Sequence, residues 1–414
     1  MKKIVVCIPT YNRIDLIREF LETQTEIYFN NNIDIWIYDS NEGDECKKLV
    51  NKYSEMYNNI FYVSISSSVH SNEKVMRIYQ GQDREKEYEY LWLSQDAYRI
   101  TDNELKEIIS LIDKEYDIIT ISNDDVECIG SKEYHNLLFY FRDAAWKLTG
   151  YGNCIVKTST MTDGVDWDYI NGKYLDKSCI NYSHVGYYFE QLLNINNPHM
   201  YFKHVYNNEY YWSSLKKQSA WTKDTFHIIC NVWPALVNKL PSFYDCMKNE
   251  VIKSLGVKAS ILSYRKFINL RKLDVYNENV FNTYKGNWNK YCDLDEEFLE
   301  KLAMIIPDEV ERFEWERLEA FCKKYSRIYI YGCGIISEHI VDLLEKNSQE
   351  WEAFLVTKDY NHSRIIHNHP VIRFEKTLLN KETGIIMGLR QSYYNEIVKE
   401  FNLGNKINQL LAMY

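Results

Sequence analysis

The chain has 414 residues, of which 45% are hydrophobic and 15% aromatic, including 35 tyrosines. At roughly 150 residues per domain, this length is enough for two or three domains with cores of their own. The formal net charge is −10, which argues against nucleic acid as a main partner because phosphate backbones require a basic face.

The ten cysteines show no CxxC pair and no metal-ligand spacing, so we expect reduced thiols, no zinc site and a cytoplasmic protein. No run of about 18 apolar residues occurs, and the sequence therefore predicts no transmembrane helix. The apolar run that follows Met1-Lys2-Lys3 is too short for a signal peptide. A peripheral contact with a membrane and self-association into a homo-oligomer both stay open.

The first 125 residues alternate between two patterns. Short apolar runs predict strands over 4–8, 33–39, 60–65, 89–93 and 116–122. Apolar residues spaced three or four apart predict helices over 14–28, 46–57, 72–82 and 101–114. This alternation predicts an α/β fold with a doubly wound, mostly parallel sheet. Pro9 has no N–H to donate to a neighbouring strand, so we expect the first strand to end before it.

The rest of the chain predicts two further parts. The pattern loosens from 125 to 225, and residues 226–325 are mainly helical. Strands over 327–331, 351–356, 370–372 and 384–389, with a helix that ends near 346, predict a small Rossmann-like α/β domain. We therefore expect three parts, namely 1–225, 226–325 and 326–414.

Polar residues follow several of the predicted strands. Thr10 and Tyr11 come after the first strand, Asp39 ends the second, and Asp96 follows the fourth. In open α/β sheets, ligands bind in the crevice at the carboxyl ends of the strands. We therefore expect these side chains to face one crevice, where an aromatic ring and a hydroxyl can hold a flat base.

The string Ile-Pro-Thr-Tyr-Asn-Arg at 8–13 resembles the opening of family 2 nucleotide-sugar glycosyltransferases, which have the GT-A fold. The resemblance covers residues 1–125 and extends by architecture to about 225. It implies that Thr10, Tyr11 and Asp39 hold the nucleotide base of a sugar donor.

The string at 91–97 is similar to the carboxylate motif of that family, commonly Asp-x-Asp or Gly-Asp-Asp. Only Asp96 is kept, because Ser94 replaces the first acid of Asp-x-Asp, or Ala97 replaces the second acid of Gly-Asp-Asp. The resemblance implies that Asp96 binds Mn²⁺ or Mg²⁺ on the donor diphosphate, and one carboxylate can suffice for such an ion.

Three basic residues are candidates for contact with the diphosphate. Lys74 and Arg77 lie three apart and therefore on one face of the predicted helix. Lys217 belongs to a basic stretch that could close over phosphate as a lid. For the base that deprotonates the acceptor hydroxyl, several carboxylates remain as alternatives: Asp143, Asp166, Asp168 and Glu190.

The resemblance implies a metal-assisted, inverting glycosyltransferase of the hexosyltransferase type. It would move a sugar from a nucleotide diphosphate donor, with UDP favoured, to a glycan or glycoprotein acceptor. Assembly of bacterial surface polysaccharide or of protein-linked glycans is a setting that fits. The helical middle and the tail would then be accessory.

Two alternatives remain open. Gly332-x-Gly334-x-x-Ser337 follows a strand and opens a helix, and Asp359 stands near the end of the next strand, as in a dinucleotide site. The chain would then be an NAD-dependent nucleotide-sugar oxidoreductase or epimerase. The missing second acid of the carboxylate motif instead allows a catalytically inactive, transferase-like scaffold.

Overall fold

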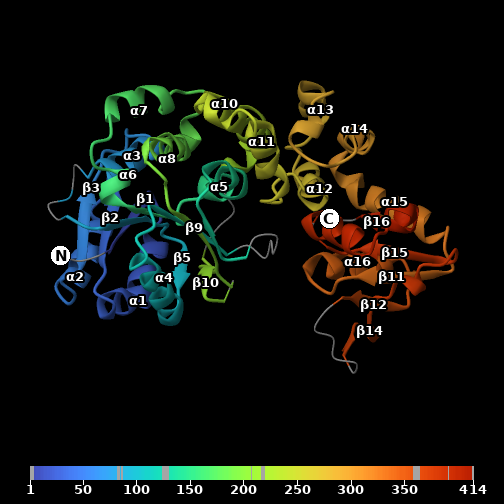
Figure 1. Cartoon of the computed structure of the whole chain (residues 1–414). Helices are drawn as coiled ribbons and strands as arrows, with labels where there is room; N and C mark the ends of the chain where they lie inside the picture. The colour runs from blue at the N-terminus through green and yellow to red at the C-terminus, as the bar shows by residue number, and fades with distance from the viewer. Residues whose placement is uncertain are drawn as a thin grey trace. The chain divides into compact units, whose positions relative to one another are not determined.

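The computed structural model describes residues 4–81, 84, 87–123, 130–206, 208–215, 220–357, 364–389 and 391–412. The chain forms two compact units, Met1–Ile252 and Lys253–Tyr414 (Figure 1). Their boundary falls within α11 (Lys248–Val257). The expected three-part division, with boundaries after 225 and 325, stays a prediction.

An eight-stranded sheet forms the centre of the first unit, in the order β3-β2-β1-β4-β8-β6-β9-β7. Strands β1 to β4 run parallel, β8 is antiparallel to β4 and β6, β9 is parallel to β6, and β7 is antiparallel to β9. The predicted mostly parallel α/β sheet is thus confirmed. The strands are β1 (Ile4–Thr10), β2 (Asp34–Asp39), β3 (Ile60–Ser64), β4 (Tyr90–Leu93), β6 (Ile118–Ser122), β7 (Lys132–Tyr134), β8 (Cys154–Lys157) and β9 (Met200–His204).

The helices that follow the first strands cover both faces of this sheet. Figure 1 shows α1 (Ile14–Asn30) and α4 (Asp102–Ile112) on one side and α3 (Ser71–Gln80) and α8 (Ser183–Asn194) on the other. The main apolar core takes Ile17, Phe20 and Leu21 from α1 and alternate residues of β1. The predicted helix over 46–57 is α2 (Glu45–Ser54), and Thr101 caps α4 as its hydroxyl accepts a hydrogen bond from the Glu104 backbone N–H at 3.3 Å.

Strand β1 runs through Pro9 to Thr10, although the sequence predicted that it ends before Pro9. The Cys7 carbonyl accepts from the Ser94 N–H at 2.9 Å, so it points toward β4. Pro9, two residues on, has the same orientation. Strand β4 pairs only with the part of β1 up to Cys7, so no ladder hydrogen bond is lost at Pro9, and β2 continues the pairing to Thr10.

Residues 130–252 form short helices and strands, and many of their aromatic rings are in contact with one another. A two-stranded antiparallel sheet of β5 (Tyr98–Ile100) and β10 (Tyr210–Trp212) is stabilised by the Tyr98 ring, which stacks on Tyr210 and Trp212 with centroids 4.4 and 3.9 Å apart. The remaining helices of the unit are α5 (Leu137–Ala144), α6 (Thr158–Met161), α7 (Trp167–Tyr174), α9 (Thr225–His227) and α10 (Trp233–Lys239).

The second unit begins with helices and ends in a six-stranded sheet, ordered β13-β14-β12-β11-β15-β16 and parallel except for β13. The helices are α12 (Tyr264–Lys272), α13 (Glu278–Tyr284), α14 (Glu296–Met304), α15 (Val310–Cys322), α16 (Ile335–Lys346) and α17 (Gln391–Glu400). The strands are β11 (Arg327–Tyr331), β12 (Ala353–Val356), β13 (Ile365–Ile366), β14 (His369–Arg373), β15 (Thr383–Met387) and β16 (Leu410–Ala412).

The second unit has its own core, which packs Tyr329, Leu355 and Ile385 of three neighbouring strands together. At the end of β11, Gly332 has a φ of 93°, and a Cβ there would meet the Gly388 carbonyl oxygen at 3.0 Å. The Ser337 hydroxyl donates to the same carbonyl at 3.1 Å. The glycine-rich turn therefore packs closely against the end of β15, and Asp359 lies outside the described residues.

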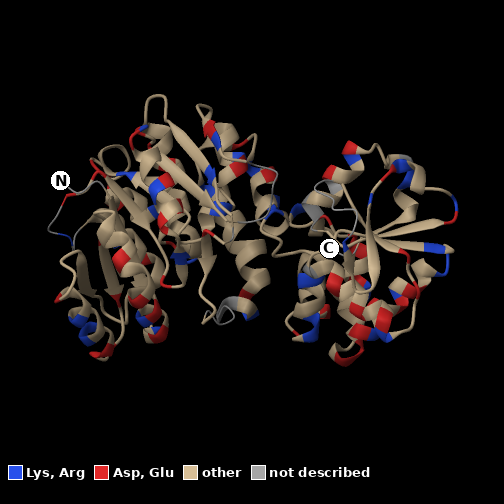
Figure 2. Cartoon of the chain, turned by 90° about the horizontal axis from the view of Figure 1, so that it is seen from below, with Lys and Arg blue, Asp and Glu red and all other residues tan. Residues whose placement is uncertain are grey.

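Acidic and basic residues alternate along the described parts of both units (Figure 2). The nine described cysteines are all free thiols. Within the described ranges, none of the helices combines the length and the apolar character needed to cross a membrane.

Candidate functional site

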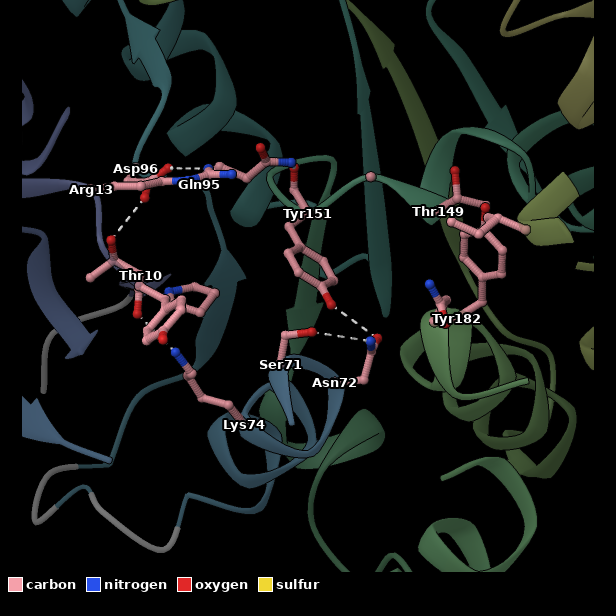
Figure 3. Close-up of a pocket in the computed structure, with 15 residues that line it drawn as sticks. Thr10, Arg13, Ser71, Asn72, Lys74, Gln95, Asp96, Thr149, Tyr151 and Tyr182 are labelled. Carbon is pink, nitrogen blue, oxygen red and sulfur yellow. Dashed lines mark hydrogen bonds and ion pairs between the residues drawn. The ribbon is translucent and has the colours of Figure 1, made fainter. Parts of the chain in front are cut away.

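A cavity of about 430 Å³ lies at the carboxyl ends of β1 and β4 (Figure 3). Its walls come from the β1–α1 loop, the start of α3, the loop after β4 and several segments between 149 and 228. The lining residues are Pro9, Thr10, Tyr11, Arg13, Ser71, Asn72, Lys74, Gln95, Asp96, Thr149, Gly150, Tyr151, Asn181, Tyr182 and Ile228.

Asp96 is a buried carboxylate held from two sides. Its Oδ2 accepts a hydrogen bond from the Thr10 hydroxyl at 2.8 Å, and its Oδ1 forms an ion pair with Arg13 Nη1 at 3.2 Å. Asp96 is 2% exposed, whereas the Arg13 side chain is 51% exposed. Thr10 ends β1 and Arg13 precedes α1, so the sheet and the helix start together fix the orientation of this carboxylate.

Lys74 places a buried amine at the floor of the cavity. Its Nζ donates to the Thr10 carbonyl oxygen at 2.8 Å and to the Ser40 hydroxyl. These contacts take two of the three donors of an ammonium group. Burial lowers the pKa of Lys74 to about 8, although the nearby carboxylates of Asp39 and Asp96 act in the opposite direction.

Asp39 lies at the end of β2, but it is fully buried and is not among the residues that line the described cavity. One carboxylate oxygen accepts from the Asn41 backbone N–H at 3.0 Å, and the other accepts from the Tyr62 hydroxyl at 3.0 Å. Burial, and next the Asp39 carboxylate, raise the pKa of Tyr62. The role of Asp39 in holding a nucleotide base stays a prediction.

Tyr11 presents a ring at the mouth of the cavity, since it is 53% exposed. The loop that carries it turns at Asn12, which has a φ of 53° and whose N–H donates to the Asn41 side-chain oxygen. Asparagine tolerates this left-handed conformation better than most residues. The turn directs the chain from β1 into α1 and leaves the Tyr11 side chain in solvent.

The opposite wall is formed by the turn at Tyr151. The Tyr151 hydroxyl donates to the Asn72 side-chain oxygen at 2.9 Å, and the Gln95 amide donates to the Tyr151 carbonyl (Figure 3). Asn72, Gln95 and Tyr182 were not singled out from the sequence. Gln95 directly precedes Asp96, so its position next to that acid could have indicated it. Tyr182 lines the cavity although it is far from Asp96 in the sequence, and no local motif indicates it.

The carboxylates proposed as catalytic bases are placed elsewhere. Asp166 caps α7 by accepting from the Tyr169 N–H at 3.0 Å, and Asp168 lies in the first turn of that helix. Glu190 accepts from the Tyr169 hydroxyl at 3.0 Å and from Lys173 at 2.9 Å. None of the three acids lines the cavity as the structure describes it, and their catalytic role stays a prediction.

The other candidates also lie outside the cavity lining. Asp143 is buried on α5 and accepts from the Tyr134 hydroxyl at 2.9 Å. Arg77 is half-buried on α3, one turn beyond Lys74. Lys217 falls outside the described residues.

The acid available to a cation here is Asp96, because it is the one carboxylate among the described lining residues. Its Oδ2 carries a single hydrogen bond from Thr10, and a carboxylate oxygen has a second lone pair. Mg²⁺ accepts one or two carboxylates together with phosphate oxygens and waters. The donor set therefore fits such an ion.

A known family matches the segment that contains most of the residues lining this cavity. Residues 5–169 match the model of the family described as Glycosyl transferase family 2. The family 2 segment contains Thr10, Tyr11, Lys74, Asp96 and Tyr151. The expected resemblance to family 2 glycosyltransferases is confirmed for residues 5–169, and nothing in the match extends to the second unit.

Solved structures similar to this chain include the following three proteins. TarS 1–349 of S. aureus has a TM-score of 0.44 and 15% identity over 77% of this chain and 85% of that chain. The mannosyltransferase PcManGT of Pyrobaculum calidifontis, in complex with GDP-Man and Mn²⁺, has a TM-score of 0.40 and 11% identity over 73% and 85%. Glucosyl-3-phosphoglycerate synthase of Mycobacterium tuberculosis, in complex with Mn²⁺, UDP and glucosyl-3-phosphoglycerate, has a TM-score of 0.39 and 8% identity over 58% and 81%. No curated protein matches the chain.

Proposed function

We propose that the first unit transfers a hexose from a UDP-linked donor to a glycan or glycoprotein acceptor, with inversion at the anomeric carbon. The observation that carries the proposal is the cavity at the ends of β1 and β4. Within the family 2 segment it brings together an exposed ring at Tyr11, the Lys74 amine and the Asp96 carboxylate. Assembly of bacterial surface glycans, in the cytoplasm, is the setting that we propose.

The charges around the cavity suit a diphosphate leaving group. The Arg13 guanidinium is half-exposed beside Asp96, and the Lys74 amine lies below the same loop. Preorganised cations aimed at a departing phosphate stabilise the charge that develops in the transition state. Mn²⁺ or Mg²⁺ bound at Asp96 would supply Lewis-acid neutralisation of the same group.

In an inverting transfer, the acceptor oxygen bonds to the anomeric carbon as the bond to the diphosphate breaks, and a base takes the hydroxyl proton. We keep Asp166, Asp168 and Glu190 as candidates for that base. Arg77, Lys217 and Asp39 remain candidates for donor contacts, together with Thr10 and Tyr11.

The test is transfer or hydrolysis of a panel of UDP-, GDP- and CMP-sugars with Mn²⁺, for the full chain and for Asp96→Asn. This substitution keeps the side-chain shape but removes the charge that balances Arg13 and binds the cation. We expect one donor to turn over and Asp96→Asn to lower the rate at least 100-fold. Asp15→Asn is the matched control, since Asp15 is an exposed acid in the first turn of α1, and it should keep the rate.

Each other outcome selects an alternative. Donor binding without turnover by the unmodified protein would identify a transferase-like scaffold. A rise in the melting temperature of the protein with NAD, and with none of the nucleotide sugars, would assign the activity to the second unit. Equal rates for Asp96→Asn and Asp15→Asn would show that Asp96 has no part in the chemistry.

A further inference from the structure

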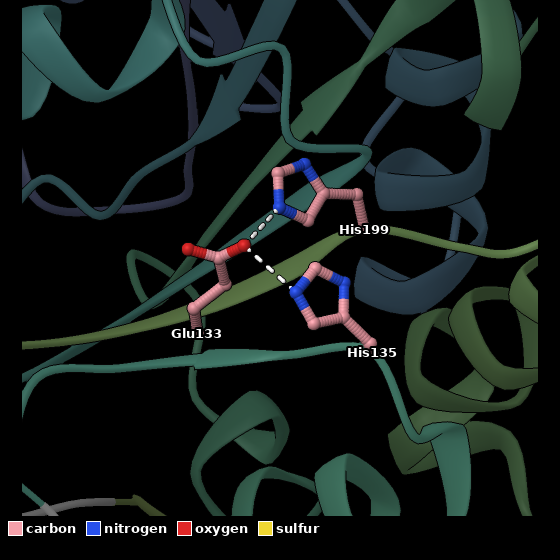
Figure 4. Close-up of side chains that lie close together, drawn as sticks. All are labelled: Glu133, His135 and His199. Atoms are coloured by element: carbon pink, nitrogen blue, oxygen red, sulfur yellow. Dashed lines mark hydrogen bonds and ion pairs between the residues drawn. The ribbon is translucent and has the colours of Figure 1, made fainter.

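The side chains of Glu133, His135 and His199 lie close together in the first unit (Figure 4). Glu133 Oε1 is 2.7 Å from His199 Nε2 and 3.0 Å from His135 Nε2. One atom from each side chain can be chosen so that all three lie within 4.8 Å of one another. The two imidazole nitrogens therefore converge on one carboxylate oxygen.

The strand register explains why the three side chains meet. Strands β7 and β9 are antiparallel, with Glu133 opposite Tyr201 and Tyr134 opposite Met200. One further step of this register places His135 opposite His199. Glu133 and His135 are two residues apart and therefore project from the same face of an extended chain. Directly opposed and diagonal side chains on one face of an antiparallel pair are in contact.

Neighbouring groups hold two of the three side chains in place. The Tyr116 ring packs against the His199 ring with centroids 4.3 Å apart, and its hydroxyl donates to Glu133 Oε2 at 3.3 Å. The His199 backbone N–H donates to the Asp117 carboxylate at 2.8 Å. The His135 and His199 rings are nearly parallel, at 6°.

We propose that Glu133, His135 and His199 form a binding site for a divalent transition-metal ion of the Zn²⁺, Ni²⁺ or Co²⁺ class. Two neutral imidazole nitrogens and one carboxylate oxygen form a ligand set that these ions favour, whereas Mg²⁺ prefers oxygen ligands alone. Solvent can complete the coordination, since the side chains of His135 and Glu133 are 76% and 44% exposed.

This site is separate from the proposed donor site, and its existence does not depend on glycosyl transfer. Strand β9 has the same direction as β1 and β4, because β8 is antiparallel to both β4 and β6 and β9 is parallel to β6. His199 precedes β9 and therefore lies at the amino ends of these strands, whereas Thr10 and Asp96 lie at their carboxyl ends. A metal here would tie β7, the last strand in the described order, to β9.

The test is titration of the full chain with Zn²⁺ at pH 7.5, with binding measured by calorimetry. We expect one Zn²⁺ site, with an affinity at least tenfold lower in both His135→Ala and Glu133→Gln. His204→Ala is the matched control, since His204 ends β9 outside the cluster, and it should bind as the unmodified protein does. Co²⁺ should give visible absorption bands that His135→Ala removes.

Equal Zn²⁺ affinities for the unmodified protein and for His135→Ala, or an equal loss in His204→Ala, would overturn the site. Zn²⁺ should also raise the melting temperature of the unmodified protein by mass action, and raise that of Glu133→Gln less at the same concentration. Melting of each variant without metal shows whether it is folded. Since Glu133→Gln is close to isosteric, it decides the result if His135→Ala is unfolded.

Discussion

At the scale of single residues, the Lys74 amine gives the proposed donor site a dependence on pH. Its pKa of about 8 means that it is charged at pH 7 and mostly neutral at pH 9. The affinity for UDP with Mg²⁺ should therefore fall about tenfold between pH 7 and 9, as the attraction to the diphosphate is lost. Calorimetric titration of the unmodified protein and Lys74→Met measures this, and the variant should bind weakly with little change over that range.

The matched control is Lys106→Met, because the Lys106 side chain is 61% exposed on α4; it should keep the full pH dependence. A pH dependence that survives in Lys74→Met would contradict the assignment.

The lowered pKa of Lys74 also has a consequence for folding. Since the folded-state pKa lies below the ordinary 10.5, the charged amine lowers the stability at pH values under 8. That loss should be relieved as the pH rises from 8 to 10.5.

At the scale of an element, the turn that carries Tyr151 depends on the glycine that follows it. Gly152 has a φ of 96°, and a Cβ there would lie 2.5 Å from the Tyr98 ring. Trp92 Nε1 and the Tyr210 hydroxyl both donate to the Gly152 carbonyl, at 3.0 and 2.8 Å. We expect Gly152→Ala to lower the free energy of unfolding by about 2–4 kcal/mol, from the positive φ together with the overpacking, as measured by urea denaturation.

Gly164 separates the two causes, since it has a φ of 71° but a Cβ added there would point into open space, with no atom beyond its chain neighbours within 4 Å. Gly164→Ala should therefore lower the free energy of unfolding by only about 1 kcal/mol, from the positive φ alone. Equal losses for the two variants would show that the contact with Tyr98 does not matter. Because Tyr151 lines the cavity, Gly152→Ala should weaken UDP binding as well, and Gly164→Ala should not.

The regular βα units are also the elements that the sequence predicted well. Strands such as β1 and β6 are buried on both faces, so they occur as continuous apolar runs, and α1 has a clear apolar stripe. Strands β5, β7 and β10 each have three residues, and such short segments lack a usable period. They form because distant partners pair with them, which no local pattern records.

The site was predictable to the extent that it follows strand ends. Thr10, Tyr11 and Asp96 could be assigned to one crevice because carboxyl ends of parallel strands meet at one edge. Asp39 meets the same rule, yet its carboxylate is taken up by Tyr62 and the Asn41 N–H. The Tyr62 hydroxyl comes from the neighbouring strand β3, and sequence spacing does not reveal such a partner.

At the scale of the whole molecule, the two compact units predict how ligands affect unfolding. The lining of the cavity lies between Pro9 and Ile228, entirely within Met1–Ile252. The second unit has a core and a sheet of its own. We expect calorimetric melting of the full chain to show two transitions, of which UDP with Mn²⁺ raises only one, because a ligand stabilises the unit that binds it.

Gly152→Ala identifies that transition without a ligand, since its contacts with Tyr98 and Tyr210 lie in the first unit. The transition that UDP raises should be the one that Gly152→Ala lowers, while the other keeps its midpoint in both experiments. NAD should leave both unchanged if the glycine-rich turn after β11 is only a packing feature, and should raise the second transition if that turn binds a dinucleotide. A rise of the second transition with UDP would place the donor site outside the first unit and contradict the assignment made from the cavity.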